Sequence, residues 1–93
     1  MKRKNWHTFA KSHNLVNRIY NMLDYLNFFE NRTESKREIK KNIYNKIRSF
    51  YYVESLAKYF EEELNRHQKD VEIRCNLVDL IHDLDFLKQY LVK

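Results

Sequence analysis

The chain contains no glycine and no proline among its 93 residues. Phosphate-binding loops of the P-loop and dinucleotide-binding kinds need glycine, so the composition argues against these nucleotide-binding classes. A sheet protein of this length would also need turns that glycine and proline usually supply. The composition therefore predicts an all-α protein, and the length is enough for one small domain, residues 1–93.

Cysteine and long apolar runs are scarce as well. Cys75 is the only cysteine, so no disulfide forms within the chain, and this usage fits a reducing compartment. No stretch approaches the roughly twenty apolar residues of a membrane span, and residues 5–14 lack the apolar run of a signal peptide. We expect a cytoplasmic protein with no membrane association.

Apolar residues recur at helical spacing in three stretches separated by short polar loops. The first stretch begins between Asn5 and Thr8 and ends at Glu30, with a seam at Phe9, Val16, Ile19, Leu23 and Leu26. The second covers residues 36 to about 66, with inward positions at Ile39, Ile43, Ile47, Phe50, Ala57, Phe60 and Leu64. The third follows Asp70 and has a heptad seam at Ile73, Leu77, Leu80, Leu84, Leu87 and Leu91.

Two of these helices have recognisable starts. Ser35 and Glu38 have the spacing of a capping box, and Asp70 is the expected cap of the last helix. An unbroken middle helix would be about 46 Å long, and its weakest helix formers are residues 49–53. We predict a small antiparallel bundle of three long helices, with the middle one continuous or bent. A break near Tyr51 would give four helices.

The outward stripe of the middle helix carries the candidate binding residues. Tyrosine and arginine dominate the hot spots of protein interfaces, and cations interleaved with aromatic rings also suit nucleic acid. Alternatively, another segment covers the tyrosines inside the monomer and leaves the cations merely solvated. The residues that we predict to contact a partner are Arg37, Lys41, Tyr44, Arg48, Tyr52 and Tyr59.

Charge is distributed unevenly along the chain. Residues 1–50 hold twelve Lys and Arg against four Asp and Glu, whereas residues 51–93 hold six against nine. This asymmetry indicates either pairing between the two halves or a basic end that meets an acidic partner. Glu72, Asp79 and Asp83 flank the last seam, where they would pair with the middle helix or across a two-fold axis.

Few residues suggest chemistry. Asp79, His82 and Asp83 form the only visible candidate for a metal or acid–base site, but helical di-iron and zinc sites need more ligands at paired spacing. Glu63 and His67 are four residues apart and are interpreted as a surface pair near a helix end. We expect no metal, no cofactor and no enzymatic activity, and an enzyme is the third choice.

The pattern as a whole favours a non-enzymatic protein-binding module that inhibits or modulates another protein. Fourteen aromatic residues are many for this size, which also suggests a homodimer. Residues with AT-rich codons abound, as in low-GC bacteria and their phages or mobile elements. Small helical proteins of such elements and bacteriocin immunity proteins are analogous in size and composition alone.

The alternative function is a nucleic-acid-binding regulator that uses the basic N-terminal half. Such binding would be strongest if cations of the N-terminus and of the middle helix cluster. The ends of an up-down bundle lie at opposite poles, which argues against the cluster. Its members would be Lys2, Arg3, Lys4, Lys36, Arg37, Lys40 and Lys41.

Overall fold

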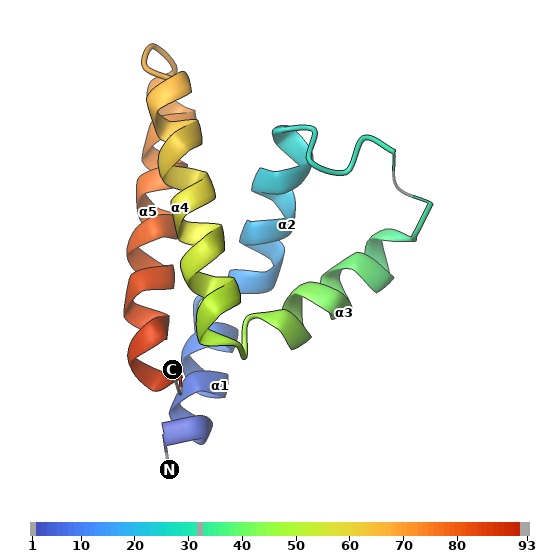
Figure 1. Ribbon diagram of the computed structural model, residues 1–93, viewed down its shortest axis with the longest axis vertical. Coiled ribbons are helices and arrows are strands. Elements are labelled where there is room, and N and C mark those ends of the chain that lie inside the picture. Colours follow the sequence, from blue (N-terminus) through green and yellow to red (C-terminus); the bar gives the residue numbers. More distant parts are fainter. Residues whose placement is uncertain (1, 32, 92–93) are drawn as a thin grey trace.

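The computed structural model describes the backbone of residues 2–31 and 33–91 and the side chains of residues 6–31 and 33–91. All regular structure in this part of the chain is helical, which confirms the all-α fold. Figure 1 shows five α-helices and a short 3-10 helix: α1 (Lys2–Ser12), α2 (Leu15–Tyr25), α3 (Lys36–Lys46), α4 (Phe50–Arg66), α5 (Val71–Leu87) and η1 (Lys88–Tyr90). None of these helices is long and apolar enough to cross a bilayer.

The first predicted helix is interrupted at Asn14, which has a left-handed backbone with φ of 53°. Glycine usually takes this position after a helix, and asparagine is the common substitute. The Asn14 N–H donates to the Lys11 carbonyl (3.1 Å) at the end of α1. The Asn14 carbonyl accepts from the Arg18 N–H (3.1 Å) at the start of α2. One asparagine thus divides the stretch into two helices.

A second left-handed asparagine ends α2 at Tyr25, five residues before the predicted end. Asn27 has φ of 61°, and its N–H donates to the Asp24 carbonyl (3.1 Å). The Phe28 N–H donates to the Leu23 carbonyl (2.9 Å). These two bonds form a Schellman motif, which satisfies the last carbonyls of a helix and turns the chain sharply. The turn places Phe28 at the surface.

The middle predicted helix is broken at residues 47–49. Ser49 has an extended backbone, and its Oγ accepts from the Tyr52 N–H (3.4 Å) as the N-cap of α4. The break lies close to the position near Tyr51 that the sequence suggested, and the prediction of a continuous or bent helix is wrong. Together with the interruption at Asn14, this break replaces the predicted three or four helices with five.

Both predicted caps are confirmed. Ser35 Oγ accepts from the Glu38 N–H (3.2 Å) at the start of α3, and Asp70 Oδ1 accepts from the Ile73 N–H (3.2 Å) at the start of α5. The heptad seam of α5 is buried from Ile73 to Leu87. Its last predicted member, Leu91, lies beyond the helix and is half-buried.

The helices pack around one apolar core. In Figure 1, α4 and α5 form an antiparallel hairpin, and α1 lies at the end of that hairpin where α5 finishes. Helix α2 packs against α5, and α3 packs against α2 while leaning away from α4. Each α-helix contributes buried side chains, the largest of which include Phe60, Leu15, Ile19, Leu23, Ile47, Leu77, Leu80 and Leu84. The isoleucines of α3 face inward, as predicted.

Candidate functional site

The break between α3 and α4 divides the six predicted contact residues between two helices. Arg37, Lys41 and Tyr44 lie on α3, Arg48 lies in the turn, and the remaining two tyrosines lie on α4. Since α3 leans away from α4 (Figure 1), the six side chains do not form one continuous row. The three cations are exposed, and the three tyrosines (44, 52 and 59) are half-buried. The prediction that these residues bind a partner is not tested by their positions.

Tyr44 and Arg48 are brought together around Trp6 of α1. The indole Nε1 of Trp6 donates to the Ile47 carbonyl (3.1 Å), and the Arg48 guanidinium lies 5.3 Å from the indole ring centre. The Tyr44 ring centre is 5.5 Å from that of Trp6, and the Tyr44 hydroxyl shares a hydrogen bond with His7 Nδ1 (2.9 Å). Trp6 therefore fixes α1 to the α3–α4 turn.

Tyr52 and Tyr59 lie in partly apolar surroundings on α4. Burial raises the pKa of the Tyr52 phenol, and the Lys46 ammonium lies 5.8 Å from its ring centre. Burial also raises the pKa of Tyr59, the Glu63 carboxylate raises it further, and Arg66 opposes the rise. Both rings are thus half-buried and partly structural.

The raised pKa of Tyr52 predicts a loss of stability in alkali. The folded state favours the neutral phenol, so this stabilisation is present below about pH 10 and is lost as the pH rises through the raised pKa. Tyr52→Phe should lose less stability than the wild type between about pH 8 and pH 11, as measured by urea unfolding. Tyr51→Phe, at an exposed position, is the control. Identical pH dependence in Tyr52→Phe and the wild type would refute the assignment.

Phe28 and Tyr59 pack against each other beside α4, and together with the exposed Tyr25 they are called the aromatic surface below. The Phe28 and Tyr59 rings are 5.4 Å apart in an edge-to-face arrangement. Phe28 is 57% exposed and Tyr25 is 53% exposed. The Tyr25 ring lies 6.4 Å from His67, which continues the row of Tyr59 and Glu63. The end of α2 therefore lies along this row of α4.

Sequence reasoning identified Tyr59 but missed Tyr25 and Phe28. Both residues fall within the predicted helix that continued to Glu30, and neither was given a role there. Their exposure depends on the left-handed Asn27, which ends α2 and turns the chain. The available signal was an asparagine directly after the last seam residue, Leu26, in a chain that has no glycine to end its helices.

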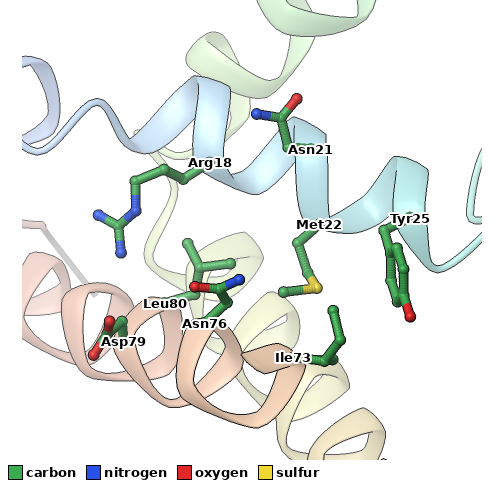
Figure 2. A pocket seen from close by; sticks show the side chains of 8 residues that line it. All are labelled: Arg18, Asn21, Met22, Tyr25, Ile73, Asn76, Asp79 and Leu80. Atoms are coloured by element: carbon green, nitrogen blue, oxygen red, sulfur yellow. The ribbon is translucent and has the colours of Figure 1, made fainter. Parts of the chain in front are cut away.

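A cleft of about 310 Å³ between α2 and α5 adjoins the aromatic surface through Tyr25. Figure 2 shows Met22, Ile73 and Leu80 between the two helices, with Asn76 beside Leu80, Arg18 and Asp79 at one end and Tyr25 at the other. Its lining residues are Arg18, Asn21, Met22, Tyr25, Ile73, Asn76, Asp79 and Leu80. An apolar floor with a polar rim suits the insertion of an apolar side chain.

The positive and negative charges of the two halves remain largely separate in space. Among the described side chains, Arg18 with Asp83 is the one ion pair that joins α1–α3 to α4–α5, with 2.6 Å between Nη1 and Oδ2. Arg18 Nη1 also donates to the His13 carbonyl (3.0 Å). The pairing of the last helix thus involves α2 and not the predicted middle helix. Among the described side chains, the cations of α3 form no ion pair with a carboxylate.

Two of the carboxylates singled out in the sequence, Asp83 and Glu63, have structural contacts. Asp83 is neutralised by Arg18, and no cluster of three or more metal-ligating side chains is present in the described residues. The expected pair of Glu63 and His67 is present at the end of α4, but Glu63 is buried and not at the surface. Its Oε2 accepts from Arg66 Nη1 (2.7 Å), and its Oε1 lies 3.4 Å from His67 Nε2.

The described part of the chain therefore offers two surfaces of different chemistry. One is aromatic, lies along α4 and continues into the α2–α5 cleft. The other consists of four exposed cations of α3 and its turn, Arg37, Lys41, Lys46 and Arg48, and is called the basic surface below. The predicted residues Lys2, Arg3 and Lys4 lie outside the described side chains. Comparison with protein-family models finds no match for this chain, and comparisons with curated proteins and with solved structures find none either.

Proposed function

We propose that the protein is a non-enzymatic binding module that inhibits or modulates another protein. The aromatic surface and the adjoining α2–α5 cleft would make the contact, and the partner would present an apolar side chain to the cleft. The exposure of Phe28 beside Tyr59 is the observation that carries this proposal. Exposed aromatic rings grouped next to a cleft are typical of protein-interface hot spots.

The rigidity of Phe28 supports this function. Two backbone hydrogen bonds of the Schellman motif fix the turn, and the next ring, Phe29, stacks on Tyr20 with centres 5.5 Å apart. The backbone at Phe28 is therefore fixed, and its ring packs edge-to-face against both Phe29 and Tyr59. A side chain that is already ordered loses little conformational entropy on binding, which increases affinity.

The contacts of the ionisable residues support binding over catalysis. The two best-placed carboxylates, Asp83 and Glu63, already have cationic partners within α-helical segments. The Asp83 pair joins α2 to α5 and the Glu63 pair lies within α4, and both occupy carboxylate oxygens that proton transfer would need. Such a protein would inhibit or modulate its partner by covering part of the partner's surface.

Photo-crosslinking in the native host tests the proposal and identifies the partner. A benzophenone amino acid is placed at position 28, and the matched control carries it at position 51. Tyr51 is an aromatic residue of similar exposure (61%) outside the aromatic surface. Position 28 should give a discrete adduct with one protein, and position 51 should not. The absence of an adduct at position 28, or the same adducts at both positions, would rule the proposal out.

Phe28→Ser should weaken binding of the cross-linked partner by about 30-fold, the effect of losing a hot spot worth about 2 kcal/mol. The stability of the variant should stay close to that of the wild type because Phe28 is mostly exposed. Isothermal titration calorimetry with the purified partner measures the affinity. Tyr51→Ser is the control and should bind as the wild type does. Equal affinities for all three proteins would disprove the role of Phe28.

A further inference from the structure

Helix α3 differs in composition from the aromatic surface. Its buried side consists of isoleucines that pack inward, and its exposed side is almost entirely Arg, Lys and Asn. No exposed side chain of α3 is apolar, and a single carboxylate interrupts the cations. The exposed residues of the helix and its turn are Lys36, Arg37, Glu38, Lys41, Asn42, Asn45, Lys46 and Arg48.

The cations of the basic surface are available to a partner. Within the described side chains, Arg37, Lys41, Lys46 and Arg48 make no ion pair, and two of them lie over aromatic rings. The carboxylates of the chain are concentrated on α4 and α5, and the single ion pair to that half uses Arg18. The charge separation would orient α3 toward an anionic partner.

A groove extends this basic region toward α1. It has a volume of about 300 Å³ and separates Tyr44 of α3 from Lys11 of α1. Its lining residues are His7, Ala10, Lys11, Asn14, Val16 and Tyr44. Lys11 is exposed, so it adds a cation on the wall opposite α3. The break between α3 and α4 produces this juxtaposition, which an up-down bundle of three helices would not provide.

From these observations we infer a further activity: α3 binds duplex DNA, with its side chains in the major groove and its cations on the flanking phosphates. The core of a protein interface is rich in aromatic residues and poor in lysine, and the exposed side of α3 has the opposite composition. Protein–DNA interfaces are polar and strongly positive. Arginine and lysine contact guanine and phosphate, and asparagine contacts adenine.

The shape of α3 favours DNA over RNA. The helix has 11 residues and is about 16 Å long. The major groove of B-form DNA, about 12 Å wide, admits an α-helix. The major groove of an A-form RNA duplex is too narrow for one. The position of α3 at the edge of the molecule, leaning away from α4 in Figure 1, leaves its outward side open to a duplex.

Fluorescence anisotropy with a labelled DNA duplex of about 20 base pairs tests the inference. Four phosphate contacts predict a slope of about −3 to −4 for log affinity against log salt, equivalent to roughly a 100-fold loss between about 50 and 200 mM salt. The double variant Arg37→Ala/Lys41→Ala should bind at least about 10-fold more weakly and reduce the slope by about 2.

Lys58→Ala/Lys69→Ala is the matched control, because it removes the same charge from exposed positions outside α3. Its affinity should stay within about twofold of the wild type. Phe28→Ser should also bind DNA normally, since the aromatic surface shares no residue with the basic surface. Equal losses in both double variants would overturn the inference, as would tighter binding of an RNA duplex or of a polyglutamate peptide.

Discussion

Phe60→Ala is expected to lower the free energy of unfolding by about 3 to 5 kcal/mol. Phe60 is fully buried on α4 in the single apolar core. Removing its ring forfeits the burial of that surface and leaves a cavity that the surrounding helices cannot fully close. A domain of this length has a total stability of roughly 5 to 14 kcal/mol. The substitution therefore removes a large part of the stability of the protein.

Urea unfolding followed by circular dichroism measures this loss. The midpoint should fall sharply in Phe60→Ala, whereas Tyr51→Ala, at an exposed position of the same helix, should change the free energy by no more than about 0.5 kcal/mol. A loss below about 1 kcal/mol for Phe60→Ala would show that the core is not centred on this ring.

Trp6→Ala is expected to have the second large effect, a loss of about 3 to 5 kcal/mol in the free energy of unfolding. Trp6 is only 4% exposed, and it joins α1 to the α3–α4 turn through its hydrogen bond to the Ile47 carbonyl. The substitution removes the buried indole, the donor to Ile47 and the surface against which Tyr44 and Arg48 pack. The C-terminal end of α3 and its turn then lose their attachment to α1, while the packing of α3 against α2 remains.

Trp6→Phe separates the hydrogen bond from the ring. It retains most of the apolar contact but leaves the Ile47 carbonyl without its donor, so the expected loss is about 1 to 3 kcal/mol. Hydrogen exchange should show faster opening of the α3 amides, including those of Ile39 and Ile43, than of the α5 amides. Unchanged protection of α3 in this variant would argue against Trp6 as its anchor.

The starts of α3 and α5 and most of their buried positions could be predicted from local chemistry, whereas α1 begins at Lys2, before the predicted start between Asn5 and Thr8. Ser35 and Asp70 have side chains that cap a helix in isolation, and the seam of α5 follows a regular heptad. The inward position of Ile39 and Ile43 was predicted correctly because apolar residues at helical spacing are the buried ones here. These features depend on residues close together in sequence, so a single sequence contains the information.

The helix breaks could not be predicted in the same way. Apolar residues keep their helical spacing across Asn14 and across Ser49, so periodicity continues where the backbone does not. The chain contains several asparagines, and residue type alone does not distinguish Asn14 and Asn27, which take the left-handed conformation, from those inside the helices. With no glycine or proline in the chain, the usual signals for a helix end are absent.

The candidate site was predicted only in part, because the helix breaks that bring its residues together were not visible in the sequence. Arg37, Lys41 and Arg48 are exposed on or beside α3, as the stripe predicted. The sequence could not show that Tyr44 meets His7 and Trp6, because that contact joins residues almost forty positions apart. Nor could it show that Tyr59 faces Phe28, since this contact requires the turn at Asn27. Both surfaces therefore arise from the breaks.

The separation of the aromatic surface from the basic surface depends on the break at residues 47–49, where α3 has ended and α4 has not yet begun. Backbone NMR chemical shifts of the whole protein test it most directly, because Cα shifts report helical and non-helical residues one by one. The structure predicts helical shifts over residues 36–46 and 50–66, with non-helical values at residues 47–49. Uninterrupted helical shifts from residue 36 to residue 66 would mean one long helix, with its cations and tyrosines in a single row, and would contradict the two surfaces described for this protein.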